Sequence, residues 1–163
     1  MDLNGNGQPL MDVVLRFFQE ERWNFQKTND RPVIRAGFHG DRGTWVCYAR
    51  VDEEQRRFLF HSLMGLNIAP LYRPAVLEYL NRVNYRLLIG SFEMDMERGD
   101  VRFRTGVEVP EGELSVAMVR SLVYTNVRAM DYYFPGVIAV MNSGLSPMAA
   151  LARVEAQVVE SLQ

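Results

Sequence analysis

The stretch at residues 88–109, LIGSFEMDMERGDVRFRTGVEV, carries the clearest structural signal in the chain. Apolar and polar residues alternate on both sides of a turn at residues 97–100, with Phe92 before the turn and Phe103 after it. Alternation with a period of two is typical of a half-buried strand. The stretch therefore predicts a β-hairpin.

The same alternation upstream predicts three strands, or four, before this hairpin. It runs through residues 33–38 and 44–51, which are joined by the turn Gly40-Asp41-Arg42-Gly43, and then through residues 56–64. The two glycines can adopt the positive φ that a tight hairpin turn needs. In the third segment Phe58 and Phe60 oppose Leu59, His61 and Leu63, and apolar residues on both sides indicate a central strand.

Helical spacing of apolar residues marks four further segments, near residues 9–22, 74–85, 114–141 and 147–163. Pro74 suits a helix start, and the pair Ser146-Pro147 suits the N-cap and first position of the last helix. Pro135 is expected to kink or restart the third helix.

The resulting order is α-β-β-β(β)-α-β-β-α-α. Strands that follow one another through short turns form a mainly antiparallel sheet, so we predict an α+β fold with helices packed on that sheet. A length of 163 residues fits one domain, which we place at residues 9–163 after a flexible tail at residues 1–8.

Composition excludes several classes of protein. A net charge of −2 argues against binding of nucleic acid or anionic membrane by bulk electrostatics. The single cysteine, Cys47, excludes an internal disulfide and suits a reducing cytoplasm. The uncharged residues 132–152 are long enough to span a bilayer, but Asn142, Ser143 and Pro147 in their middle predict helix, turn and helix instead.

No constellation of catalytic or metal-binding residues emerges. His39 and His61, the two histidines, have no acidic or cysteine partner at ligand spacing, and Cys47 is expected to face apolar neighbours as an inert thiol. The acids around residues 93–100 follow the solvent side of a strand and lack the ligand order of a calcium loop. We therefore expect no catalytic residues, no metal and no cofactor.

Two groups of residues are candidates for binding a partner. Arg35, Arg102 and Arg104 fall on one predicted sheet face, and guanidinium groups bind carboxylates, phosphates and aromatic faces. The alternative is an ordinary solvated face on which acids such as Glu93 and Glu108 pair with the arginines.

The second group is Tyr132, Tyr133 and Phe134, three aromatic residues directly before Pro135. At the expected helix break they cannot all face one core, so at least one is a candidate for an exposed partner contact. Packing in the core is the alternative.

The segment at residues 81–109, NRVNYRLLIGSFEMDMERGDVRFRTGVEV, resembles the YbjN family of bacterial sensory transduction regulators. Further matches are Asp131, Tyr133 and Pro135, and then Gly144, Ser146-Pro147 and Ala150. The resemblance implies a fold similar to type III secretion chaperones and a homodimer, and it supplies no catalytic residues. A departure from those chaperones is an extra helix pair expected after Pro135.

Together these features predict a cytoplasmic, non-enzymatic regulatory domain that binds a protein partner through an apolar groove or the sheet surface. The alternative is a regulator that binds a small anion or nucleotide between Arg35, Arg102 and Arg104. The identity of the partner is not encoded in any motif of the sequence.

Overall fold

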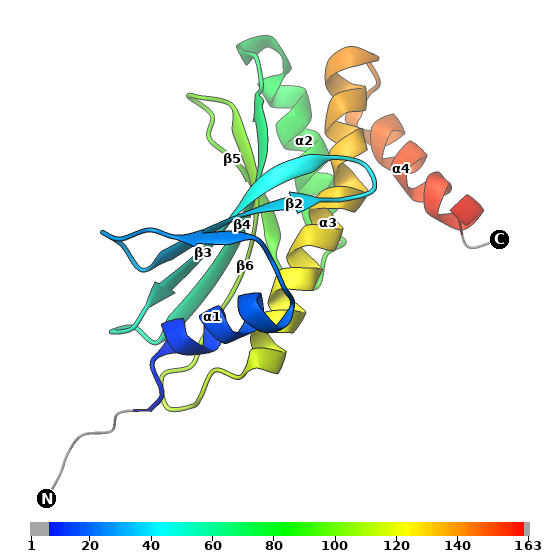
Figure 1. Cartoon of the computed structure of the whole chain (residues 1–163). Helices are drawn as coiled ribbons and strands as arrows, with labels where there is room; N and C mark the ends of the chain where they lie inside the picture. The colour runs from blue at the N-terminus through cyan, green and yellow to red at the C-terminus, as the bar shows by residue number, and fades with distance from the viewer. Residues whose placement is uncertain (1–6, 162–163) are drawn as a thin grey trace, which may run out of the picture.

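A computed structural model of the protein describes residues 7–161, with side chains described as far as residue 157. One antiparallel sheet has the strand order β1-β2-β3-β4-β6-β5 (Figure 1). Its strands are β1 (Phe25–Lys27), β2 (Val33–His39), β3 (Thr44–Asp52), β4 (Arg57–Asn67), β5 (Ser91–Met94) and β6 (Asp100–Glu108). The helices are α1 (Leu10–Glu20), the short 3-10 helix η1 (Pro70–Tyr72), α2 (Arg73–Asn84), α3 (Val116–Asn142) and α4 (Pro147–Ser161). The predicted α+β class and element order are confirmed, and β1 is the optional fourth strand before α2.

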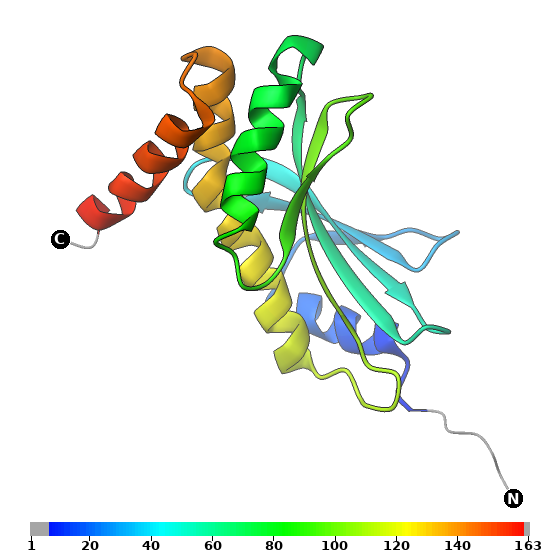
Figure 2. The same cartoon turned by 180° about the vertical axis from the view of Figure 1, so that it is seen from behind.

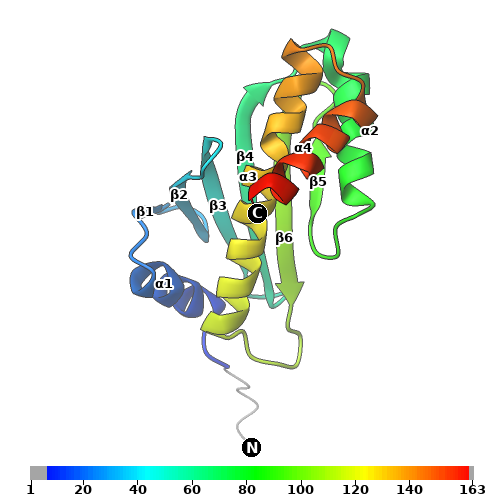
Figure 3. The same cartoon turned by 90° about the vertical axis from the view of Figure 1, so that its right-hand side faces the viewer.

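The α-helices lie on one side of the sheet (Figures 1 and 3). Helix α3 packs across β4 and β6, α1 lies beside α3 over β3, and α2 lies between β5 and α3 (Figure 2). Helix α4 packs on the outside of α2 and α3. The core between the helices and the sheet holds large side chains such as Phe17, Phe58, Phe60, Tyr79 and Phe103, all with no exposed area.

Helix α3 continues through Pro135, so the restart expected there, and with it the helix break after the aromatic residues, is wrong. Proline removes one backbone donor but its φ suits a helix. Two side chains from other elements supply donors to carbonyls beside the gap: Tyr79 Oη donates to the Tyr133 carbonyl (2.9 Å) and Arg42 Nη1 to the Tyr132 carbonyl (3.3 Å). One helix, α4, therefore follows α3 instead of the expected pair.

Strand β5 begins at Ser91, later than the alternation from Leu88 predicts. Leu88 is fully exposed, and Gly90 has a φ of +82°, which turns the chain. The Asn84 side chain, at the end of α2, then bonds both backbone groups of Phe92, accepting from its N–H (2.8 Å) and donating to its carbonyl (3.0 Å). Strand β5 pairs with β6 over four residues, including Phe92, so Asn84 bonds the outer edge of β5.

The last helix begins as predicted, because the Ala149 amide donates to Ser146 Oγ (3.2 Å). Ala150, Leu151 and Val154 of α4 are buried. The side chain of Val158, all of Leu162 and most of the tail expected at residues 1–8 lie outside the part of the chain that is described.

Candidate partner-binding surface

The sheet face that is turned away from the helices has an apolar centre between two groups of arginines. We call it the open face; its side chains are Arg35, Val46, Tyr48, Arg50, Leu59, His61, Leu63, Glu93, Arg102 and Arg104. In the register of the sheet Tyr48 lies opposite His61, and His61 opposite Arg104. Val46, Tyr48, Leu59 and Leu63 are half-buried although no described helix covers them, since neighbouring side chains on the face shield one another.

The three arginines predicted to bind a partner do share this face, but they do not converge. Glu93 pairs with both Arg102 (2.6 Å) and Arg104 (2.7 Å), as the alternative of a paired surface predicts. Arg35 lies on β2, three strands away from β6. At about 4.8 Å per strand this separates their backbones by about 14 Å, too far for one small anion to contact all three directly.

His61 lies in the middle of the open face with only 8% of its surface exposed. Desolvation, helped by the positive charge of Arg102 and opposed by Glu93, lowers the pKa of His61 to about 4. The imidazole is therefore neutral near pH 7, and it contributes an uncharged surface to the centre of the open face.

A hollow of about 570 Å³ opens on this face beside the start of β5. Its wall includes Leu59, Ile89 and Gly106, and a Cβ at Gly106 would lie only 2.5 Å from the Leu59 side chain. Strand β6 pairs with β5 from Val101 to Arg104, whereas the ladder with β4 runs on to Glu108. On the β5 side, residues 105–108 of β6 therefore present a strand edge that no described strand covers.

The aromatic residues of the second predicted group lie on α3, on the helical side of the molecule, and do not join the arginines. Tyr133 packs edge-on against Phe92 (ring centroids 6.1 Å apart) and Tyr132 (4.5 Å). Arg42 lies over the Tyr132 ring at 5.7 Å. All three aromatic residues are half-buried. Each therefore packs partly against the core and is partly exposed, which combines the two alternatives given by the sequence.

The β2–β3 turn is joined to α3 by a contact that the sequence did not predict. The Asp131 carboxylate accepts hydrogen bonds from the backbone amides of Asp41 (3.0 Å) and Arg42 (2.8 Å). Neither glycine of the turn has the positive φ that the sequence suggested. Gly40 is needed for space instead, because a Cβ there would lie 2.3 Å from Asp131 Oδ1. The aspartate and the turn are far apart in sequence, and the only available signal was the glycine pair of the turn.

Cys47 is fully buried, as predicted, and burial raises the pKa of its thiol to about 12. Within the described residues no three His, Cys, Asp or Glu side chains lie close enough together to hold a metal ion. None of the helices in this part of the chain is both long and apolar enough to cross a membrane.

This antiparallel sheet, with one helix-covered face and one open face, is an α+β fold similar to that of type III secretion chaperones. Over 82% of this chain, the crystal structure of YbjN from E. coli, described as "a putative transcription regulator", superimposes with a TM-score of 0.61, 12% identity and 92% coverage of that chain. The HopA1–SchA chaperone–effector complex matches over 74% of this chain and 89% of its own, with a TM-score of 0.51 and 13% identity. The ExsC–ExsE complex reaches a TM-score of 0.49 and 12% identity, covering 82% of this chain and 94% of its own.

Residues 11–139 match the family model of YbjN, "Putative bacterial sensory transduction regulator". The chain therefore belongs to the YbjN family, as the resemblance at residues 81–109 suggested. Among curated proteins, none matches the chain significantly in sequence.

Proposed function

We propose that this protein is a non-enzymatic regulator that binds a partner protein on the open face of its sheet. The observation that carries the proposal is the composition of that face: half-buried Val46, Tyr48, Leu59 and Leu63 form its centre without a covering layer. Apolar surface of this kind gains free energy when a partner removes it from water. A cytoplasmic location, expected from the lone Cys47, is part of the proposal.

The free edge of β6 supports an extended segment of the partner as the ligand. A strand laid along residues 105–108 would continue the line of β5 and pair with backbone groups that the described strands leave free. Its side chains would enter the hollow beside Gly106 and reach Leu59. Backbone pairing would supply affinity, and the hollow would select the side chain that enters it.

Charge reversal at Arg35 tests which face is used. Arg35 is exposed on β2, and Arg16 is exposed on α1 on the other side of the sheet. Tagged Arg35→Glu and Arg16→Glu variants are used to capture bound proteins from a lysate of the source organism. We expect specific prey to be lost with Arg35→Glu only. Equal recovery with both variants, repeated with Leu63→Asp on the same face, would refute the open face as the binding surface.

We also propose that the protein forms a homodimer, with the apolar surface along α2 as the contact. This α2 patch consists of Leu71, Leu77, Tyr85, Leu88, Ile89 and Met148. Tyr85 is 92% exposed and Leu88 fully exposed, and apolar side chains gathered on a surface are typical of an interaction site. A two-fold axis would bring the same patch of each subunit together.

Size-exclusion chromatography with light scattering tests the dimer. We expect a dimer at micromolar concentration, conversion to a monomer by Tyr85→Glu with Leu88→Glu, and no change with Met96→Glu, an exposed apolar side chain in the β5–β6 turn. A strictly monomeric unmodified chain would contradict the proposal.

The small-anion alternative finds no support in the sheet arginines. Glu93 already pairs with both Arg102 and Arg104, and Arg35 lies three strands away.

A further inference from the structure

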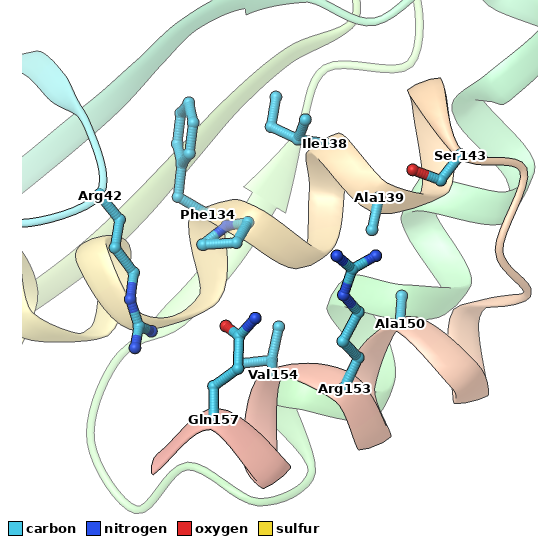
Figure 4. A pocket seen from close by; sticks show the side chains of 10 residues that line it. Arg42, Phe134, Ile138, Ala139, Ser143, Ala150, Arg153, Val154 and Gln157 are labelled. Atoms are coloured by element: carbon cyan, nitrogen blue, oxygen red, sulfur yellow. The ribbon is translucent and has the colours of Figure 1, made fainter. Parts of the chain in front are cut away.

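The side of the molecule opposite the open face contains a second hollow, in the groove between α3 and α4 (Figure 4). Its volume of about 360 Å³ is within the range of small-molecule sites. The apolar part of its wall comes from Phe134, Pro135 and Ile138 of α3 and Val154 of α4. Arg42, from the β2–β3 turn, and Arg153, from α4, line the same hollow from different elements.

No described acidic side chain forms an ion pair with either of these two guanidinium groups. In the hollow on the open face Arg57 pairs with Glu108 (2.5 Å) and Arg104 with Glu93 (2.7 Å). Within residues 7–157, neither Arg42 nor Arg153 has a carboxylate at ion-pairing distance. The hollow between α3 and α4 therefore combines an apolar wall with uncompensated positive charge.

Arg42 is also held in place before any ligand arrives. The Asp131 carboxylate accepts from its backbone amide (2.8 Å), its Nη1 donates to the Tyr132 carbonyl (3.3 Å), and its guanidinium lies over the Tyr132 ring. These contacts leave other guanidinium donors free, since the group carries five N–H donors. A positioned arginine loses little conformational entropy on binding a carboxylate, which favours affinity.

We propose that this groove is a binding site for a small carboxylate with an aromatic or branched apolar body. The apolar body would lie against Phe134, Ile138 and Val154, and the carboxylate would accept hydrogen bonds from Arg153, whose planar donor group matches its geometry. Arg42, which lines the hollow at another place (Figure 4), would add a second positive charge to the same site. The site is separate from the open face, so it adds a ligand to a regulator that binds its partner elsewhere.

Three probes with the same ring system test the proposal: 2-naphthoate, the neutral 2-naphthamide and the cationic 2-naphthylmethylamine. Methyl NMR spectra of Ile138 and Val154 report occupancy of the groove, and titration gives Kd. Because a charge-assisted contact is lost, we expect 2-naphthoate to bind about tenfold more tightly than the amide, and the amine more weakly still. Added salt should weaken the naphthoate complex.

Variants separate the charge from the shape of the groove. Arg153→Met keeps the aliphatic stem and should raise the Kd of 2-naphthoate about tenfold, whereas Arg16→Met on α1 should leave it unchanged. Ser143→Trp, at the exposed rim, should block all three probes. Equal affinity for acid and amide, no saturation, or shifts confined to the open face would overturn the proposal. These outcomes are independent of prey capture by Arg35 variants, so either proposal can fail alone.

Discussion

Substitution of Gly136 by alanine tests how α2 and α3 are packed. The added Cβ would lie 1.9 Å from Tyr79 Oη and 2.2 Å from its Cζ, so the ring has to move. Tyr79 has no exposed surface and its hydroxyl donates to the Tyr133 carbonyl (2.9 Å), so movement also breaks this hydrogen bond. Gly136 thus allows Tyr79 to reach the helix backbone beside Pro135.

The expected loss of stability is the sum of two destabilising effects less one stabilising effect. Overpacking costs about 1–3 kcal/mol and loss of the Tyr79 hydrogen bond about 0.5–1.5 kcal/mol, while alanine returns about 1 kcal/mol of helix propensity. The free energy of unfolding should therefore fall by about 2 kcal/mol, a shift in Tm of about 4–8 °C for a chain of this length.

Urea unfolding followed by circular dichroism measures this change. Gly112→Ala is the control, because nothing lies within 4 Å of a Cβ at that position, and its effect should stay within about 0.5 kcal/mol. In a Tyr79→Leu background the Gly136→Ala substitution should cost at least about 1 kcal/mol less, since the clashing ring is gone. Stabilisation by Gly136→Ala in the unmodified background, as helix propensity alone gives, would refute the packing described for Tyr79.

Three further predictions concern side chains buried or bonded at single positions. The folded-state pKa of His61, about 4, is below the ordinary value of about 6.5, so the unfolded chain takes up the proton first and stability falls as the pH drops between these values, by at most about 3 kcal/mol. Urea unfolding of His61→Gln should lack this slope, and an identical pH dependence in both proteins would contradict the burial of the imidazole. Asp131→Ala should destabilise the fold by about 1–2 kcal/mol and speed hydrogen exchange of the Asp41 and Arg42 amides, whose bonds to the carboxylate it removes; unchanged exchange would count against this contact. With its pKa raised to about 12, Cys47 should react with thiol reagents at mildly alkaline pH only as fast as the chain unfolds, and a rate equal to that of an exposed thiol would show that it is accessible.

Alternation in sequence was sufficient to predict β2, β3, β4 and β6, because each of these strands buries one face under helices and exposes the other. Strand β1 is three residues long, too short for a periodic signal. The late start of β5 coincides with the positive φ of Gly90, and Asn84 of the preceding helix bonds the outer edge of the strand at Phe92. Contacts of this kind are not encoded in the local pattern.

The candidate site was likewise predicted only in part. That Arg102 and Arg104 share a face follows from their spacing, and Glu93 was correctly foreseen as a possible partner. The distance to Arg35 depends on the insertion of β4 between β3 and β6, and the sequence does not specify this order. Helix α3 continues through Pro135, so the proline alone was a misleading sign of a break.

Site-specific photocrosslinking tests most directly whether the open face binds a partner protein. A benzoylphenylalanine at Tyr48, in the centre of that face, and another at Gln19, exposed on α1, would be irradiated in cells of the source organism. The proposed function predicts a discrete protein adduct from position 48 and none from position 19. Adducts from position 19 together with an unmodified band at position 48 would contradict it.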